Sequence, residues 1–113
     1  MINSLFNRGP QVPETTVSET VAARDAGTIQ ILDVREPEEW ADGHIPGAVH
    51  IPLGSLPARI NELDQNQPVV VVCRSGVRSL TGAEILLKAG FGDAKSMAGG
   101  MIDWAAVGQP VER

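Results

Sequence analysis

Apolar residues fall into short strand-like runs separated by stretches with helical spacing, starting near residue 14. The run Val69–Val72 is wholly β-branched and predicts a central parallel strand that is covered on both faces. Residues 29–34 indicate a second buried strand. Shorter extended segments are expected at residues 14–17, 48–51 and 94–97.

Helical patterns fill the intervals between these strands. Ser18 is expected to cap a helix over residues 19–26. Residues 53–63 carry apolar side chains along one face and predict a second helix. Further helices are expected at residues 37–41, 78–89 and 101–107, followed by an irregular tail at residues 108–113.

The alternation of strands and helices predicts an α/β fold with three layers, α/β/α, around a four- to five-stranded, mainly parallel sheet. Residues 1–13 contain Gly9, Pro10 and Pro13 and are expected to form a flexible leader. Residues 14–113 are expected to form one domain. In such sheets the sites form at the carboxyl ends of the strands.

Composition narrows the function classes. The net charge of −5 and the pI of about 4.9 argue against nucleic acid or an anionic membrane as partner. No apolar run reaches the roughly 18 residues of a membrane span, and the start of the chain lacks a secretory pattern. A single cysteine excludes an internal disulfide and favours a reducing cytoplasm.

That cysteine, Cys73, stands where the strand Val69–Val72 ends and a short loop opens into the helix at residues 78–89. Backbone N–H groups of such a loop and a helix N-terminus stabilise a thiolate. Lowering the thiol pKa from ~8.5 to ~6 requires about 3.4 kcal/mol, and a helix end supplies only ~0.3–1 kcal/mol. We therefore expect the loop N–H groups, with Arg74 and Arg78, to supply the rest.

The length of this loop separates two kinds of chemistry. Phosphotyrosine-type phosphatases place five residues between the cysteine and the arginine that holds the phosphate. Here four residues separate Cys73 from Arg78, and Ser79 follows. The shorter loop favours a smaller reacting centre, such as one sulfur atom carried on the thiolate. A phosphatase or an arsenate reductase remains the less favoured alternative.

Three segments of the chain resemble those of the single-domain rhodaneses, the thiosulfate sulfurtransferase family. The first is Leu-Asp-Val-Arg-Glu at residues 32–36 with Gly-His-Ile-Pro-Gly-Ala at residues 43–48. The second is the loop Cys-Arg-Ser-Gly-Val-Arg at residues 73–78. The third is Ala-Gly-Gly-Met-Ile-Asp-Trp at residues 98–104. The resemblance covers roughly residues 16–111 and implies the rhodanese-like fold for residues 14–113.

The resemblance implies a two-step reaction without a cofactor or a metal ion. The Cys73 thiolate would take sulfane sulfur from thiosulfate, form a persulfide, and pass the sulfur to cyanide or a cellular thiol. The third loop position, often basic in thiosulfate-preferring members, is Ser75, and Arg78 is expected to compensate. The expected substrate-binding loop consists of Arg74, Ser75, Gly76, Val77 and Arg78.

Asp33 and Arg35 are supporting candidates because they follow a strand that the family fold places beside Cys73. Arg35 either binds the donor or orders the loop, or it forms a structural ion pair with Asp33 or Glu36, and we favour the ion pair.

Other residues carry structural expectations. His44 and His50 are expected to be structural, because two histidines and one cysteine give no metal-ligand spacing. The Gly99-Gly100 pair is expected to allow an unusual turn beside the loop. Trp40 and Trp104 are interpreted as core residues.

Two functions from different classes remain open. The first is an enzyme that loads Cys73 from thiosulfate or a similar anionic donor unaided. The second is a sulfur-carrier or relay module that a protein donor, such as a cysteine desulfurase, must load. Because the chain has no second thiol, the sulfur must leave to another molecule, for which a sulfur-relay protein or thioredoxin is a candidate.

Overall fold

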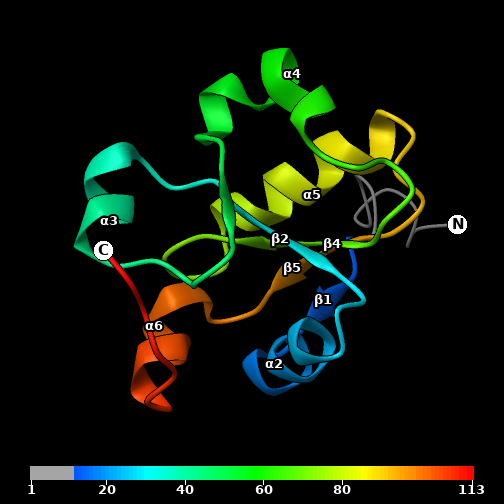
Figure 1. Cartoon of the computed structure of the whole chain (residues 1–113). Helices are drawn as coiled ribbons and strands as arrows, with labels where there is room; N and C mark the ends of the chain where they lie inside the picture. The colour runs from blue at the N-terminus through cyan, green and yellow to red at the C-terminus, as the bar shows by residue number, and fades with distance from the viewer. Residues whose placement is uncertain (1–11) are drawn as a thin grey trace, which may run out of the picture.

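The computed structural model describes residues 12–113, which fold into three layers (Figure 1). The middle layer is a five-stranded sheet of order β1-β5-β4-β2-β3 in which all neighbouring strands are parallel. The predicted α/β architecture is thereby confirmed, with β4 at the centre. The strands are β1 (Glu14–Thr15), β2 (Gln30–Asp33), β3 (Val49–His50), β4 (Val69–Val72) and β5 (Ala94–Met97).

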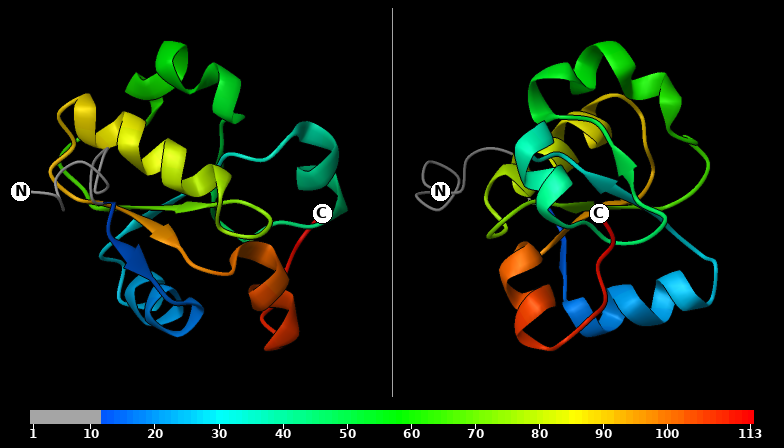
Figure 2. Two further views of the ribbon diagram at one scale, coloured as in Figure 1. Left: turned by 180° about the vertical axis from the view of Figure 1, so that it is seen from behind. Right: turned by 60° about the vertical axis from the view of Figure 1, so that its left-hand side comes forward.

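Helices cover both faces of the sheet (Figure 2). Helices α4 and α5 lie on one face and α2 and α6 on the other, while α3 lies beside the carboxyl ends of the strands. The α-helices are α2 (Val17–Asp25), α3 (Pro37–Asp42), α4 (Leu56–Arg59), α5 (Arg78–Lys88) and α6 (Gly100–Ala106). No helix in the described part of the chain is long and apolar enough to cross a membrane.

The valines of β4 alternate between two hydrophobic clusters. Val71 packs in the cluster that contains Leu56 and Leu86, from α4 and α5. Val72 packs in the cluster that contains Trp104, from α6. Each of the four valines is at most 5% exposed, so the residue that follows β4 begins inside the core. Trp104 is fully buried, as expected of a core residue.

The first helix begins earlier than the sequence analysis predicted. Thr16, and not Ser18, is the N-cap, because its hydroxyl accepts the N–H of Glu19 at 3.0 Å. The Glu19 carboxylate accepts the N–H of Thr16 at 3.1 Å in return. This reciprocal pair is a capping box, and it ends β1 at Thr15.

The predicted helix at residues 53–63 is wrong as a continuous α-helix. The segment is a 3₁₀ turn at Leu53–Ser55, the short α4, and a second 3₁₀ turn at Ile60–Glu62. Pro57 lacks the N–H that an α-helix starting at Leu53 would need, and it is tolerated only in the first turn of α4. The predicted apolar face is nevertheless present, since Leu56, Ile60 and Leu63 all pack in or against the hydrophobic core.

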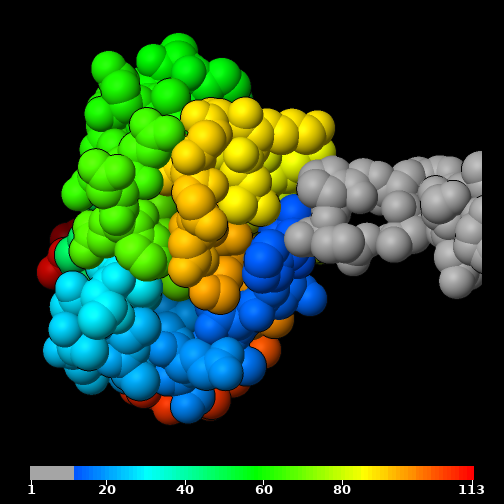
Figure 3. All heavy atoms as spheres, turned by 90° about the vertical axis from the view of Figure 1, so that its right-hand side faces the viewer, coloured from blue at the N-terminus to red at the C-terminus, as the bar shows by residue number. Residues whose placement is uncertain are grey.

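Figure 3 shows the start of the described chain (blue) against the segment around β5 (orange). The strands of this parallel sheet all begin at the end opposite Cys73, which follows β4. There the Gln30 side chain donates to the carbonyl of Asp64 at 2.6 Å, at the start of β2. Of the predicted leader, residues 1–11 lie outside the described residues. The carbonyl of Pro13 accepts the N–H of Ser96 at 2.9 Å, which places the chain before β1 against β5.

Candidate active site

The Cys73 sulfur lies at the carboxyl end of β4 in a cradle of hydrogen-bond donors. The residue is 1% exposed. Its Sγ accepts the N–H of Gly76 at 3.1 Å and the N–H of Ser79 at 3.3 Å. The hydroxyl of Ser79 lies 3.3 Å from Sγ. The loop therefore surrounds the sulfur with groups that stabilise negative charge.

The first turn of α6 holds the outer side of this loop. The carbonyl oxygens of Cys73 and Arg74 accept the N–H groups of Met101 and Ile102 at 2.9 and 3.0 Å. These bonds use N–H groups that a helix start leaves free, and they turn the loop carbonyls away from the sulfur. Gly100, at φ 54°, permits the approach, since a Cβ there would collide with both carbonyl groups. The predicted role of the Gly99-Gly100 pair is thus confirmed.

Gly76 gives the loop its tight curl. Its φ is 101°, in a region that side chains other than hydrogen rarely tolerate. A Cβ at Gly76 would stand 3.1 Å from the backbone nitrogen of Gly99. The loop can therefore point its N–H groups at the sulfur only with glycine at this position.

Burial and hydrogen bonding act in opposite directions on the Cys73 thiol. Burial alone would raise its pKa, because it disfavours the thiolate. The Ser79 hydroxyl and the N–H groups of Ser79, Gly76 and Ser75 outweigh this effect and lower the pKa below the ordinary value. The cradle thus favours the nucleophilic form of the sulfur.

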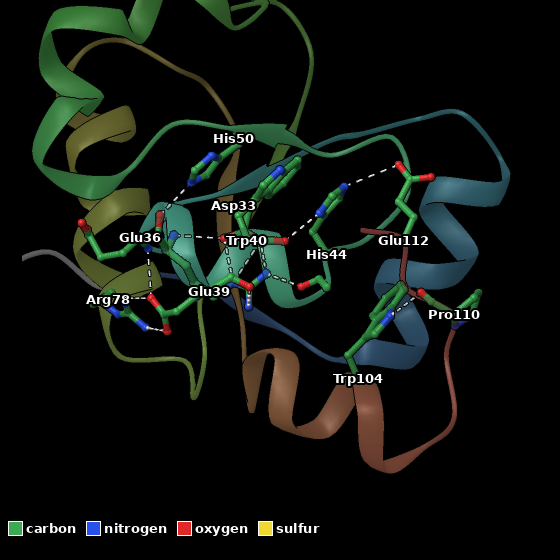
Figure 4. Close-up of polar contacts among 12 residues, drawn as sticks. Asp33, Glu36, Glu39, Trp40, His44, His50, Arg78, Trp104, Pro110 and Glu112 are labelled. Carbon is green, nitrogen blue, oxygen red and sulfur yellow. Dashed lines mark hydrogen bonds and ion pairs between the residues drawn. The ribbon is translucent and has the colours of Figure 1, made fainter.

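Arg78, the last residue of the predicted loop, is held by a carboxylate (Figure 4). Its two terminal nitrogens donate to the two carboxylate oxygens of Glu39, on α3, each at 2.8 Å. The hydrogen bonds from Arg78 lower the pKa of Glu39 to about 2. A positive charge at the start of a helix is unfavourable, because the helix dipole is positive there. The carboxylate of Glu39 offsets this effect for Arg78 at the start of α5.

Asp33 and Arg35 form a buried ion pair, as the sequence analysis favoured. Arg35 Nη2 lies 2.7 Å from an Asp33 carboxylate oxygen, and the two side chains are 7% and 1% exposed. The guanidinium also donates to the backbone carbonyls of Glu39 and Gly43 at 3.2 and 2.8 Å. Arg35 thus ties α3 and the residue that follows it to the end of β2.

The remaining arginine of the loop faces open space. The exposed side chain of Arg74 lines a cavity of about 340 Å³ beside the loop. The side chains of Ser75 and Val77 are also exposed, Val77 by 69%. The other residues that line this cavity are Arg35, Glu39, Asp42, Met101, Ile102 and Ala105.

Both histidines stack on Trp40 beside α3 (Figure 4). The ring centroids of Trp40 and His44 lie 3.5 Å apart, and those of Trp40 and His50 lie 4.6 Å apart. Their ring nitrogens bond to the carbonyls of Trp40 and Arg35 at 2.9 and 2.8 Å, which suits structural roles. Between residues 12 and 113, no three His, Cys, Asp or Glu side chains group as metal ligands.

Two residues of the site were not found from the sequence. Ser79 stands one position beyond the six-residue loop, in the first turn of α5, where side chains point back toward the helix start. That direction is a signal that could have identified it as a partner of the sulfur. Glu39 is 39 residues from Arg78, and no local pattern predicts their contact.

Comparison with known proteins agrees with this geometry. Residues 16–107 match the model of the rhodanese-like domain family. The chain is 47% identical over 77 residues to YrkF of Bacillus subtilis (strain 168), named as a candidate sulfur carrier protein. That match covers 68% of this chain and only 42% of YrkF, so the chain spans less than half of that relative.

A second relative and a solved structure match over most of their own length. The protein named "Sulfurtransferase" of Allochromatium vinosum is 38% identical over 96 residues, which cover 83% of this chain and 90% of that protein. A rhodanese-related protein from Thermoplasma volcanium superposes with a TM-score of 0.81 at 27% identity, covering 88% of this chain and 97% of the other. The chain therefore belongs to the rhodanese-like family, whose single-domain relatives include sulfurtransferases.

Proposed function

We propose that this protein is a sulfurtransferase that carries sulfane sulfur as a persulfide on Cys73. The observation that supports this function best is the donor cradle around a buried sulfur. The N–H groups of Gly76 and Ser79 stand 3.1 and 3.3 Å from Sγ. The same groups favour a thiolate before transfer and an anionic persulfide after it.

The proposed loading step is a displacement at sulfur. The Cys73 thiolate attacks the outer sulfur of thiosulfate and forms a new S–S bond. The S–S bond of thiosulfate breaks, and its electron pair leaves on sulfite. Cyanide or a thiolate then attacks the terminal sulfur, and the Cys73 thiolate leaves. No proton is removed from the nucleophile in either step, which fits a thiol whose pKa is already lowered.

One charged side chain of the loop is available to a small anionic donor. Arg74 lines the adjacent cavity and is the basic side chain of the loop that faces open space. Because Cys73 is the only cysteine of the chain, the second step requires an external acceptor. A thiol of another molecule, including that of thioredoxin, fits this requirement. A reducing cytoplasm is the compartment that suits such a reaction.

The intact mass after incubation with thiosulfate tests this function. The reduced protein is expected to gain one sulfur atom, which cyanide then removes as thiocyanate. The variant Cys73→Ser should gain nothing. A free thiol that gains no sulfur would contradict thiosulfate as the donor.

A sulfur relay is the second candidate, and the similarity to the candidate sulfur carrier YrkF favours it. In that case a cysteine desulfurase supplied with cysteine would load Cys73, while thiosulfate alone would not. A phosphatase or an arsenate reductase is disfavoured, because Arg78 is held by Glu39 and not free to clamp a phosphate. Hydrolysis of an aryl phosphate that Cys73→Ser abolishes would overturn that judgement.

A further inference from the structure

We infer that Glu39 sets the charge preference of the site, by withholding Arg78 from dianionic donors and so favouring persulfides carried on thiols. The inference rests on the proposed function for its substrate class. It rests on the structure for the contact between Glu39 and Arg78, the last residue of the active loop (Figure 4).

In this geometry, both terminal nitrogens of Arg78 are already used in hydrogen bonds and are not free to bind a substrate. Both of its terminal nitrogens donate to Glu39 at 2.8 Å, in the paired arrangement by which arginine also binds oxyanions. Glu39 is itself fixed, since one carboxylate oxygen accepts the N–H of Glu36 at 3.0 Å. A dianion that used Arg78 would have to displace a carboxylate that α3 holds in place.

The other charges near the loop nearly cancel. Arg35 lines the cavity, but its charge is balanced by Asp33 at 2.7 Å. Arg74 and Asp42 remain, each without an ion-pair partner among residues 12–113 and of opposite sign. The cavity therefore carries no net positive charge, although three arginines surround the loop.

The α6 wall of the cavity has a different character. Met101, Ile102 and Ala105 present apolar side chains there, and Ile102 is 46% exposed. Thiosulfate has no carbon atoms that could use such a surface. A persulfide on a thiol carrier brings an aliphatic chain and a lower charge at the reacting end, and it suits both the apolar wall and the balanced charges.

Alkylation of Cys73 by two reagents of different charge tests the role of Glu39. The thiolate displaces iodide from iodoacetate, an anion, or from iodoacetamide, which is neutral, and the S–C bond forms as the C–I bond breaks. The ratio of the two rates cancels changes in thiolate content. In Glu39→Gln and Glu39→Ala the iodoacetate-to-iodoacetamide ratio should rise about threefold, as one additional unit charge near an anion in water produces.

The matched control is Glu62→Gln. It removes the same charge from a paired glutamate, since Glu62 binds Arg59 at 2.8 Å. Glu62 lies in the second 3₁₀ turn, after α4, and it does not line the cavity beside the active loop. The iodoacetate-to-iodoacetamide ratio of Glu62→Gln should equal that of the unaltered protein. In the double variant Glu39→Gln/Arg78→Gln, the ratio should also return to the value of the unaltered protein. An unchanged ratio in both Glu39 variants, or an equal rise in Glu62→Gln, would overturn the inference.

The sulfur-transfer assay separates this inference from the proposed function. In Glu39→Gln the kcat/KM for thiosulfate should rise relative to that for glutathione persulfide. A chain that never forms a persulfide would contradict the proposed function and leave the alkylation result standing. A persulfide that forms with an unchanged preference in Glu39→Gln would contradict the inference alone.

Discussion

At the scale of single residues, two buried hydroxyl groups behind the sulfur form a directional pair. Ser79 Oγ and Ser96 Oγ lie 2.6 Å apart, and neither side chain is exposed. Two hydroxyls bring two hydrogens, and their mutual bond uses one. Within the described residues, the other has one remaining acceptor, Cys73 Sγ at 3.3 Å from Ser79. The pair is fully satisfied when the sulfur is an anion, so it favours the thiolate.

Removing the Ser79 hydroxyl should raise the pKa of Cys73, because the thiolate loses a donor while burial still disfavours it. For Ser79→Ala we expect a rise of roughly one pH unit, the effect of one hydrogen bond to a charged group. The rate of iodoacetamide alkylation against pH measures this shift. Thr81→Ala, at an exposed position of the same helix, should leave the midpoint in place.

Ser96 should act on the sulfur only through Ser79. Ser96→Ala is expected to raise the pKa of Cys73 by a smaller amount, because the Ser79 hydroxyl loses the neighbour that orients it. In the Ser79→Ala background the same substitution should have no effect. The four variants form a double-mutant cycle by alkylation against pH. Equal shifts in both backgrounds would show that Ser96 acts independently.

At the scale of elements, the loop is a structure shared between β4, α5 and α6. β4 ends just before the cysteine, α5 supplies Ser79, and α6 donates two N–H groups to the loop carbonyls. The cradle therefore depends on the position of α6 as much as on the residues of the loop. Gly100 is the point of closest contact, with its φ of 54° against the carbonyls of Cys73 and Arg74.

Gly100→Ala should displace the start of α6 from the loop. The Cβ of alanine would collide with the carbonyl groups of Cys73 and Arg74, and the positive φ at this position is unfavourable for alanine. We therefore expect the unfolding free energy to fall by more than about 1 kcal/mol. Urea denaturation measures that loss, and the pKa of Cys73 should rise in the folded variant. Gly92→Ala is the control, because a Cβ at Gly92 meets no atom within 4 Å.

The ion pair between α3 and α5 should contribute stability with a defined pH dependence. The pKa of Glu39 is lowered by Arg78 to about 2, from an ordinary value of 4.5. Its contribution is therefore complete above about pH 4.5 and disappears as the pH falls toward 2. The difference in unfolding free energy between the protein and Glu39→Gln should be constant near pH 7 and should shrink steadily from about pH 4.5 toward pH 2. A difference that stays constant down to pH 3 would contradict a charged Glu39.

At the scale of the whole molecule, patterns local in sequence predicted the order of elements, and contacts distant in sequence were missed. The valine run identified the central strand, because an all-apolar strand must be covered on both faces. The prediction of one continuous helix over residues 53–63 was wrong, because Pro57 interrupts an otherwise regular apolar face. Glu39 could not be found, since its contact with Arg78 follows only once α3 and α5 are placed in space.

The tail after α6 crosses to α3, although the sequence suggested no partner for it. Glu112 and His44 exchange two backbone hydrogen bonds at 2.9 Å. The Trp104 ring nitrogen donates to the carbonyl of Pro110 at 2.9 Å (Figure 4). Local opening of the tail should therefore release α3 and α6 together, while β4 stays closed. In amide hydrogen exchange, the N–H groups of His44 and Glu112 should lose protection at one rate. The two helices that frame the sulfur would then open as a single cooperative unit.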